Sequence, residues 1–172
     1  ISNDIVEFYN PVKYEIDNNK DFSSIFSSHP QYINFNSNRY WENRYSEMYT
    51  IKRSLELVKE SKNKYDIIIF TRFDINPLKT YDINSLNPDI LYTSNKILYN
   101  KNLIGAFINI SKPSIINIYI KLFDKSYDYI KDKNTKSIHT LVRYIFKENG
   151  YVNDKNIKLL PFETNVLRYP YS

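Results

Sequence analysis

The segment KYDIIIFTRFDINP, residues 64–77, contains two side chains that could bind a ligand. Asp74 offers carboxylate oxygens, which divalent metals prefer, and a metal held there could bridge the phosphates of a nucleotide. Arg72 carries a guanidinium that can bind a phosphate or carboxylate through two parallel hydrogen bonds. The two residues could equally form a salt bridge, or Asp74 could cap the turn that follows, and the spacing alone does not decide between these readings.

The residues around this pair predict a helix followed by a strand. In the segment 39–62 apolar residues recur at three- and four-residue steps, as one face of a helix requires. This stripe consists of Trp41, Tyr45, Met48, Ile51, Leu55 and Val58, and we expect it to face the core. The segment 65–70 is apolar on both faces, which favours a central strand buried from both sides over an edge strand.

Later segments continue the alternation of strands and helices. We expect strands at 90–93, 104–111 and 157–160, and helices at about 112–124 and 137–148, the last one ending at Gly150. Ser111 is the expected N-cap of the first of these helices, with Pro113 in its first turn. Strands separated by helices predict an α/β fold. Ligands of such sheets bind beyond the carboxyl ends of the strands, where Arg72 and Asp74 would fall.

The helix and the sequence KYDIIIFTRFDI together resemble a group of bacterial and large-virus glycosyltransferase-like proteins, often linked to the synthesis of surface polysaccharides. In that group a helix leads to Tyr-Asp, an apolar strand and an Arg-x-Asp motif. The similarity continues through 106–124 and 137–152, and covers about residues 40–160. It implies a GT-A-like, Rossmann-like sheet flanked by helices, and the transfer of sugar from a nucleotide-sugar donor.

The resemblance also implies roles for single residues. Asp74 stands where related enzymes carry a metal-binding Asp-x-Asp motif, so it would hold a divalent cation, Mn²⁺ or Mg²⁺, or the donor sugar. Arg72 would contact the donor, and Tyr49 matches a Ser-x-x-Tyr pattern near the start of the helix. Arg168 could close over a pyrophosphate, although a surface arginine needs no such role. His139 could act as a base or bind phosphate, or could be a partly buried polar residue.

The sequence departs from the family pattern in two places. Family members often carry an aspartate before the strand that matches 104–111, whereas this chain has Asn102, Leu103 and Ile104. Residues 1–37 do not plainly supply the strand, helix and strand with which relatives begin. We therefore expect the sheet to lack that unit, either because the chain is a fragment or because the donor half is reduced.

The composition excludes several classes of site. The chain has no cysteine, so it has no disulfide, zinc-thiolate site or thiol nucleophile, and its 2 glycines exclude a P-loop and a dinucleotide fingerprint. A net charge of +5 favours anionic partners without choosing among them. No apolar run reaches the length of a membrane span, and the first ten residues lack the features of a signal peptide, so we expect a cytoplasmic protein. The resemblance implies that this is the cytoplasm of a bacterium or of a virus-infected host cell.

We therefore expect residues 1–172 to form a single glycosyltransferase-like domain. It would transfer a sugar from a nucleotide-sugar donor to a hydroxyl group of a glycan or other acceptor. The alternative is a catalytically inactive domain of the same fold that binds a glycan, a nucleotide or a protein. Specific recognition of nucleic acid is not expected, because the tyrosines and lysines form no organised motif.

Overall fold

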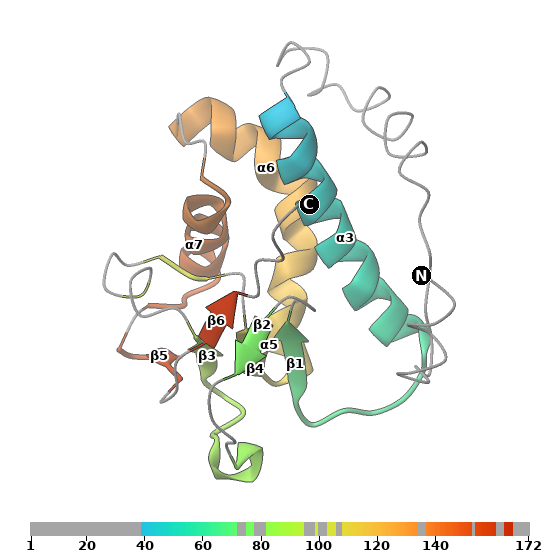
Figure 1. The fold of residues 1–172 in the computed structure, drawn as a ribbon, viewed down its shortest axis with the longest axis vertical. Helices are drawn as coiled ribbons and strands as arrows, with labels where there is room; N and C mark the ends of the chain where they lie inside the picture. The colour runs from blue at the N-terminus through green and yellow to red at the C-terminus, as the bar shows by residue number, and fades with distance from the viewer. Residues whose placement is uncertain are drawn as a thin grey trace, which may run out of the picture. The chain divides into compact units, whose positions relative to one another are not determined.

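The structure is a computed structural model that describes residues 39–71, 75–77, 82–94, 99, 103–105, 108–133, 137–152, 154–160 and 164–166 (Figure 1). The chain divides into two compact units, Ile1–Asn63 and Lys64–Ser172. We call them unit 1 and unit 2.

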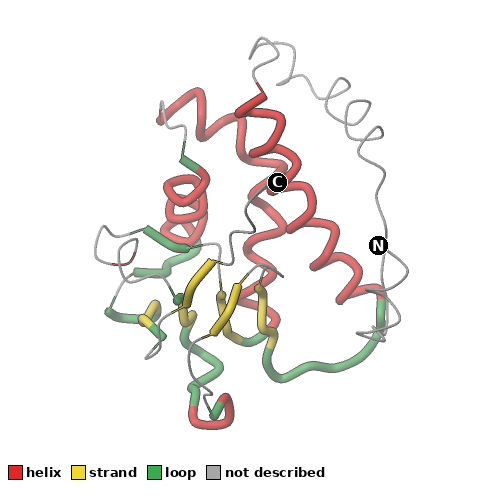
Figure 2. The backbone as a smooth tube through the Cα atoms, viewed as in Figure 1, coloured by secondary structure: helices red, strands yellow, loops and turns green. Residues whose placement is uncertain are grey.

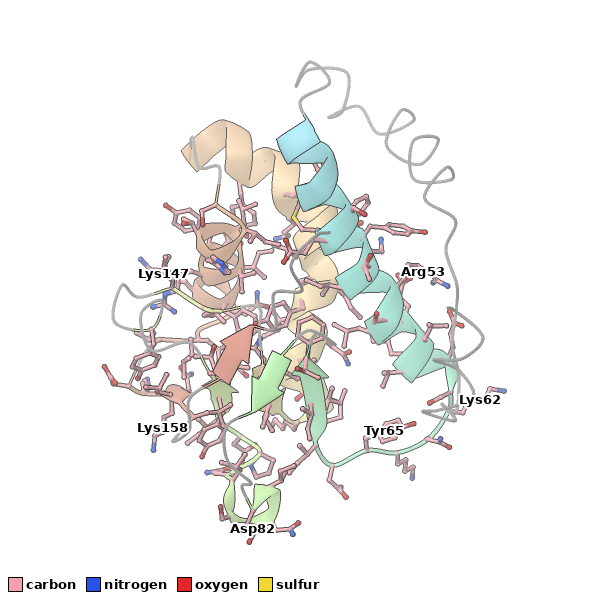
Figure 3. The ribbon with its side chains drawn as sticks, in the orientation of Figure 1. Arg53, Lys62, Tyr65, Asp82, Lys147 and Lys158 are labelled. Atoms are coloured by element: carbon pink, nitrogen blue, oxygen red, sulfur yellow. The ribbon has the colours of Figure 1, made fainter. Side chains whose placement is uncertain are left out.

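The described part of unit 1 is the helix α3 (Arg39–Glu60), which confirms the predicted helix. Four residues of the predicted apolar stripe are buried, namely Tyr45, Met48, Ile51 and Leu55, while the side chain of Trp41 lies outside the described residues. On the polar side Arg53 donates to Glu56 at 2.6 Å (Figure 3). The chain leaves the helix at Lys62, which adopts a φ of 60°.

Unit 2 is built on two sheets, drawn as yellow segments in Figure 2. The strands are β1 (Ile68–Thr71), β2 (Ile75–Pro77), β3 (Leu91–Thr93), β4 (Ile108–Ser111), β5 (Ile157–Leu159) and β6 (Thr164–Val166). Four of them form a mixed sheet in the order β1-β4-β3-β5, and β2 pairs with β6. β4 runs antiparallel to β1 and β3, whereas β3 and β5 are parallel. Consequently β1, β3 and β5 share one direction, and their carboxyl ends meet at one edge of the sheet.

The helices of unit 2 begin near the predicted positions, but the first helical segment is interrupted by a 3₁₀ turn and extends to Lys133, beyond the predicted end at about residue 124. After β4 the chain forms α5 (Pro113–Ile116), the 3₁₀ turn η2 (Asn117–Tyr119) and α6 (Ile120–Lys133), and later α7 (Ile138–Glu148). α7 buries Ile138, Leu141, Val142, Ile145 and Phe146, as the sequence predicted. The helix ends where Gly150 takes a φ of +84°, a conformation that glycine adopts readily. Helices and a mixed sheet together confirm an α/β fold.

One face of the sheet packs against these helices. Strand register places Phe70, Asn109 and Thr93 side by side in one row. The ring of Phe70 lies 5.5 Å from that of Tyr119, which lies 4.9 Å from that of Phe146. The opposite face has its own apolar cluster of Leu86, Ile108, Ile110 and Leu160. Leu86 follows the short 3₁₀ helix η1 (Ile83–Ser85), whose N-cap is Asp82 (Figure 3).

The prediction that the first strand lies at the centre of the sheet was wrong. Among the described strands β1 lies at the end of the sheet, not at its centre. Its residues alternate between half-buried and exposed, and Ile69 keeps 47% of its surface exposed. An apolar run on both faces therefore does not guarantee burial on both faces, because among the described residues only the face toward Tyr119 has a covering layer along β1.

The predicted N-cap was also wrong. Ser111 is the last residue of β4, and Lys112 is the N-cap, with Pro113 as the first helical residue, as expected. The Ser111 hydroxyl instead contacts the carbonyl oxygens of Pro88 and Ile90, at 3.0 Å and 2.8 Å. β4 also begins at Ile108, later than the predicted strand.

Candidate functional site

The carboxyl edge of the four-stranded sheet is the candidate site. It is formed by Thr71 at the end of β1, Ser94 after β3, Ile108 at the start of β4 and Leu160 after β5. The Ser94 amide donates to the Ile108 carbonyl at 3.1 Å, and the Ile108 amide donates to the Ser94 hydroxyl at 3.2 Å. Leu160 donates to the Thr93 carbonyl at 2.8 Å. These bonds fix the backbone of three strands at the edge where ligands of α/β sheets bind.

A short backbone segment, residues 103–105, lies next to this edge and is held by two side chains. Asn109 Nδ2 donates to the carbonyl oxygen of Gly105 at 2.9 Å. His139 Nδ1 lies 3.2 Å from the carbonyl oxygen of Ile104. Because a carbonyl oxygen can only accept, a hydrogen bond between these two atoms requires a proton on Nδ1.

The helix-facing side of the sheet carries polar groups just below this edge. Thr93 and Asn109 are completely buried, and Tyr119 nearly so. Thr93 Oγ1, Asn109 Oδ1 and the Tyr119 hydroxyl have no hydrogen-bond partner among the described residues. Burial raises the pKa of Tyr119 well above its usual value, so this hydroxyl stays protonated.

β2 and β6 bring together the chain segments that flank two predicted site residues. β2 begins at Ile75, directly after Asp74 in sequence, and β6 ends at Val166, two residues before Arg168. Ile75 lies opposite Val166 in the antiparallel pair. Arg72, Asp74 and Arg168 themselves lie outside the described residues.

The other two predicted site residues are described. His139 is half-buried in the first turn of α7 and contacts the candidate edge through Ile104. Tyr49 is half-buried on α3, in unit 1.

Arg143 brings a positive charge to α7, one turn beyond His139. It donates through Nη1 to the carbonyl oxygen of Tyr151 at 2.9 Å. Desolvation by burial lowers the pKa of Arg143, yet a guanidinium remains charged at neutral pH because its pKa starts so high. The same helix face therefore presents an imidazole and a permanent cation.

The described residues contain no group of three or more His, Cys, Asp or Glu side chains placed to hold a metal ion. They also contain no helix long and apolar enough to cross a membrane.

Sequence reasoning missed Asn109 and Ser94. A signal for Asn109 was present, because an asparagine interrupts the otherwise apolar run of residues 106–110. Asparagine is disfavoured in strands, so its presence in a core strand indicates a specific hydrogen bond. Ser94 had no comparable signal in a polar stretch.

Comparison with protein-family models, with curated proteins and with solved structures gave no match.

Proposed function

We propose that the chain is a glycosyltransferase-like protein that transfers a sugar from a nucleotide-sugar donor to a hydroxyl group of a glycan or other acceptor. The observation that carries the proposal is the shared direction of β1, β3 and β5. The Arg72-Phe73-Asp74 sequence directly follows the carboxyl end of β1. That edge is where a GT-A-like sheet would bind its donor. The mixed four-stranded sheet with its helices is compatible with such a fold that lacks the first strand-helix-strand unit.

The chemistry of the proposed residues suits a diphosphate donor. One aspartate carboxylate together with donor phosphates is a ligand set typical of Mg²⁺, and also suits Mn²⁺. Asp74 would hold the cation, which when bound offsets negative charge on the phosphates. Arg72 and Arg168 would bind phosphate oxygens through their guanidinium groups.

In the transfer, the bond between the anomeric carbon and the phosphate oxygen breaks, and a bond to the acceptor oxygen forms. The nucleoside diphosphate leaves with the electron pair, and the proton of the acceptor hydroxyl passes to the departing phosphate group, directly or through a base. His139 is proposed to act as a base or to bind a phosphate of the donor.

The proposal is tested by incubating the full chain with nucleotide sugars, Mn²⁺ and candidate acceptors, and measuring released nucleoside diphosphate and glycosylated product. Asp74→Ala is expected to abolish transfer and leave the melting temperature nearly unchanged. Asp128→Ala is the matched control, because Asp128 is an exposed aspartate on α6. Full activity of Asp74→Ala would refute the role of Asp74. Donor binding without any transfer would instead assign the alternative, an inactive binding domain of the same fold.

A further inference from the structure

Three buried oxygen atoms on the helix-facing side of the sheet have no hydrogen-bond partner among the described residues. They are Thr93 Oγ1, Asn109 Oδ1 and the Tyr119 hydroxyl. Thr93 and Asn109 are direct cross-strand partners on β3 and β4, which places their Cβ atoms about 4.5–5.5 Å apart. The other neighbour of Asn109 in this row is Phe70, whose ring lies 5.5 Å from that of Tyr119. Thr93, Asn109 and Tyr119 therefore belong to one region, which we call the polar patch.

The polar patch lies one residue below the carboxyl edge of the sheet. Thr93 is the last residue of β3, and Asn109 is the second residue of β4. Thr93 and Asn109 are 0% exposed and Tyr119 is 1% exposed, so a ligand group reaches the patch only when the layer above it opens. Tyr119 belongs to η2, the 3₁₀ turn between α5 and α6, and a 3₁₀ stretch within a helix often marks a hinge. The covering layer therefore has its least regular turn at the patch itself.

The hydrogen-bonding properties of the polar patch suit a hydroxyl group. Asn109 Nδ2 donates to the carbonyl oxygen of Gly105, so the remaining atom, Oδ1, can only accept. The Tyr119 hydroxyl keeps its proton and can donate, because burial raises its pKa well above the usual value. Thr93 Oγ1 can donate or accept. A ligand hydroxyl also does both, whereas a phosphate or carboxylate would meet Asn109 Oδ1 as a second acceptor and would be buried there without a counter-charge.

Buried polar atoms without a partner destabilise a fold, and proteins keep such exceptions mainly at functional sites. We propose that the polar patch binds one neutral hydroxyl group of a ligand that occupies the carboxyl edge. Asn109 Oδ1 accepts a hydrogen bond from this hydroxyl, and Thr93 or Tyr119 donates one to its oxygen. That the ligand is a sugar rests on the proposed function. That it presents a hydroxyl group follows from the three side chains alone.

Two conservative variants test the polar patch, and a third is their control. Thr93→Val and Tyr119→Phe each remove one oxygen atom and keep the shape of the side chain. Ser111→Ala is the matched control, because Ser111 carries a buried hydroxyl on the same sheet face whose contacts are made within the protein, to the carbonyl oxygens of Pro88 and Ile90. The melting temperature of each variant establishes that it is folded.

Binding to the full chain is measured by calorimetry in the presence of Mn²⁺. The probes are UDP-, GDP-, CMP- and dTDP-sugars, and the corresponding nucleoside phosphates without the sugar. We expect Thr93→Val and Tyr119→Phe to weaken the binding of the nucleotide sugar about 2- to 10-fold each, as the loss of one neutral hydrogen bond does. Binding of the nucleoside phosphate should stay unchanged in both, and Ser111→Ala should bind both probes as the wild type does.

Free monosaccharides test the polar patch without a nucleotide. The backbone amide signals of β3 and β4 are followed in ¹⁵N and ¹H correlation spectra while glucose, galactose, mannose or N-acetylglucosamine is added. Shifts that occur in the wild type and are lost in Thr93→Val would support the hydroxyl site even if no nucleotide sugar binds, and only the glycosyltransferase proposal would then fail. Nucleotide sugars that bind equally to the wild type, Thr93→Val and Tyr119→Phe would refute the hydroxyl site and leave the proposed function intact. Binding of neither kind of probe would overturn both.

Discussion

Two buried hydroxyl groups on the same sheet face are expected to affect stability in opposite directions. Ser111 and Thr93 are both at most 1% exposed, and both point toward the helices. The Ser111 hydroxyl contacts two carbonyl oxygens. Thr93 Oγ1 has no partner among the described residues. Removing the hydroxyl should therefore destabilise the protein at Ser111 and stabilise it at Thr93.

The expected magnitudes follow from the partners. Ser111→Ala removes one net hydrogen bond and leaves the Ile90 carbonyl without the contact at 2.8 Å. The Pro88 carbonyl still accepts from the Lys112 amide at 3.0 Å. A loss of about 1–2 kcal/mol in the free energy of unfolding follows. Thr93→Val keeps the β-branched shape and removes an unsatisfied oxygen, so a gain of about 1–2 kcal/mol is expected.

The assay is chemical denaturation of each variant beside the wild type, with far-UV circular dichroism to establish the native helix content. The slope of the transition must stay constant for the midpoints to be compared. If Thr93→Val loses as much stability as Ser111→Ala, then Thr93 Oγ1 has a hydrogen-bond partner, and the account of this row is wrong. Equal gains for both variants would show that the Ser111 contacts contribute nothing.

Three further predictions concern other parts of unit 2. Burial, and then the hydrogen bond from its hydroxyl to Glu148, raise the pKa of Tyr129 above 10.0. Above about pH 10 the unfolded state releases this proton while the folded state retains it, so the free energy of unfolding should fall as the pH rises. Denaturation at increasing pH should show a less steep fall for Tyr129→Phe than for the wild type. Gly150→Ala should destabilise the protein by about 1–2 kcal/mol because of its φ of +84°, since an added Cβ would meet no atom within 4 Å. Gly150→Asn should lose less stability, because asparagine tolerates this φ better. Equal losses in the free energy of unfolding of the two variants would contradict the backbone explanation. Ile69→Thr should change the free energy of unfolding by less than about 0.5 kcal/mol, whereas Ile110→Ala should lose about 2–5 kcal/mol; a large loss at Ile69 would show that β1 is covered on its outer face.

Helical periodicity predicted much of the fold. The stripe on α3 and the five buried residues of α7 came directly from the spacing of apolar residues, because a helix in contact with a core must repeat its apolar residues near every 3.6 positions. Strand pairing is not encoded in this local way. The direction of β4, the end position of β1 and the pairing of β2 with β6 depend on contacts between residues distant in sequence. β2 and β6 gave no periodic signal because each has only three residues.

The candidate site could be predicted only in part. The roles of Arg72 and Asp74 stay predictions from residue type and expected position, because both residues lie outside the described part of the chain. His139 was singled out by residue type and by its place near the start of a predicted helix. The bond from Asn109 to Gly105 and the contact of His139 with Ile104 could not be predicted, because a local pattern does not show which backbone carbonyl a side chain reaches. The cap prediction at Ser111 failed for a related reason. Its hydroxyl could accept a hydrogen bond from a nearby backbone amide or donate one to a carbonyl oxygen near β3, and in the structure it contacts the carbonyl oxygen of Ile90.

Donor binding is the most direct test of the central claim. The melting temperature of the full chain is measured with UDP-, GDP-, CMP- and dTDP-sugars, with and without Mn²⁺, for the wild type, Asp74→Ala and Asp128→Ala. A ligand that binds only the folded state, at a hundred times its Kd, stabilises it by about 2.7 kcal/mol. We predict a Mn²⁺-dependent increase with one nucleotide class, retained in Asp128→Ala and lost in Asp74→Ala. No increase with any donor, or an equal increase in Asp74→Ala, would contradict a donor site formed by the residues that follow β1.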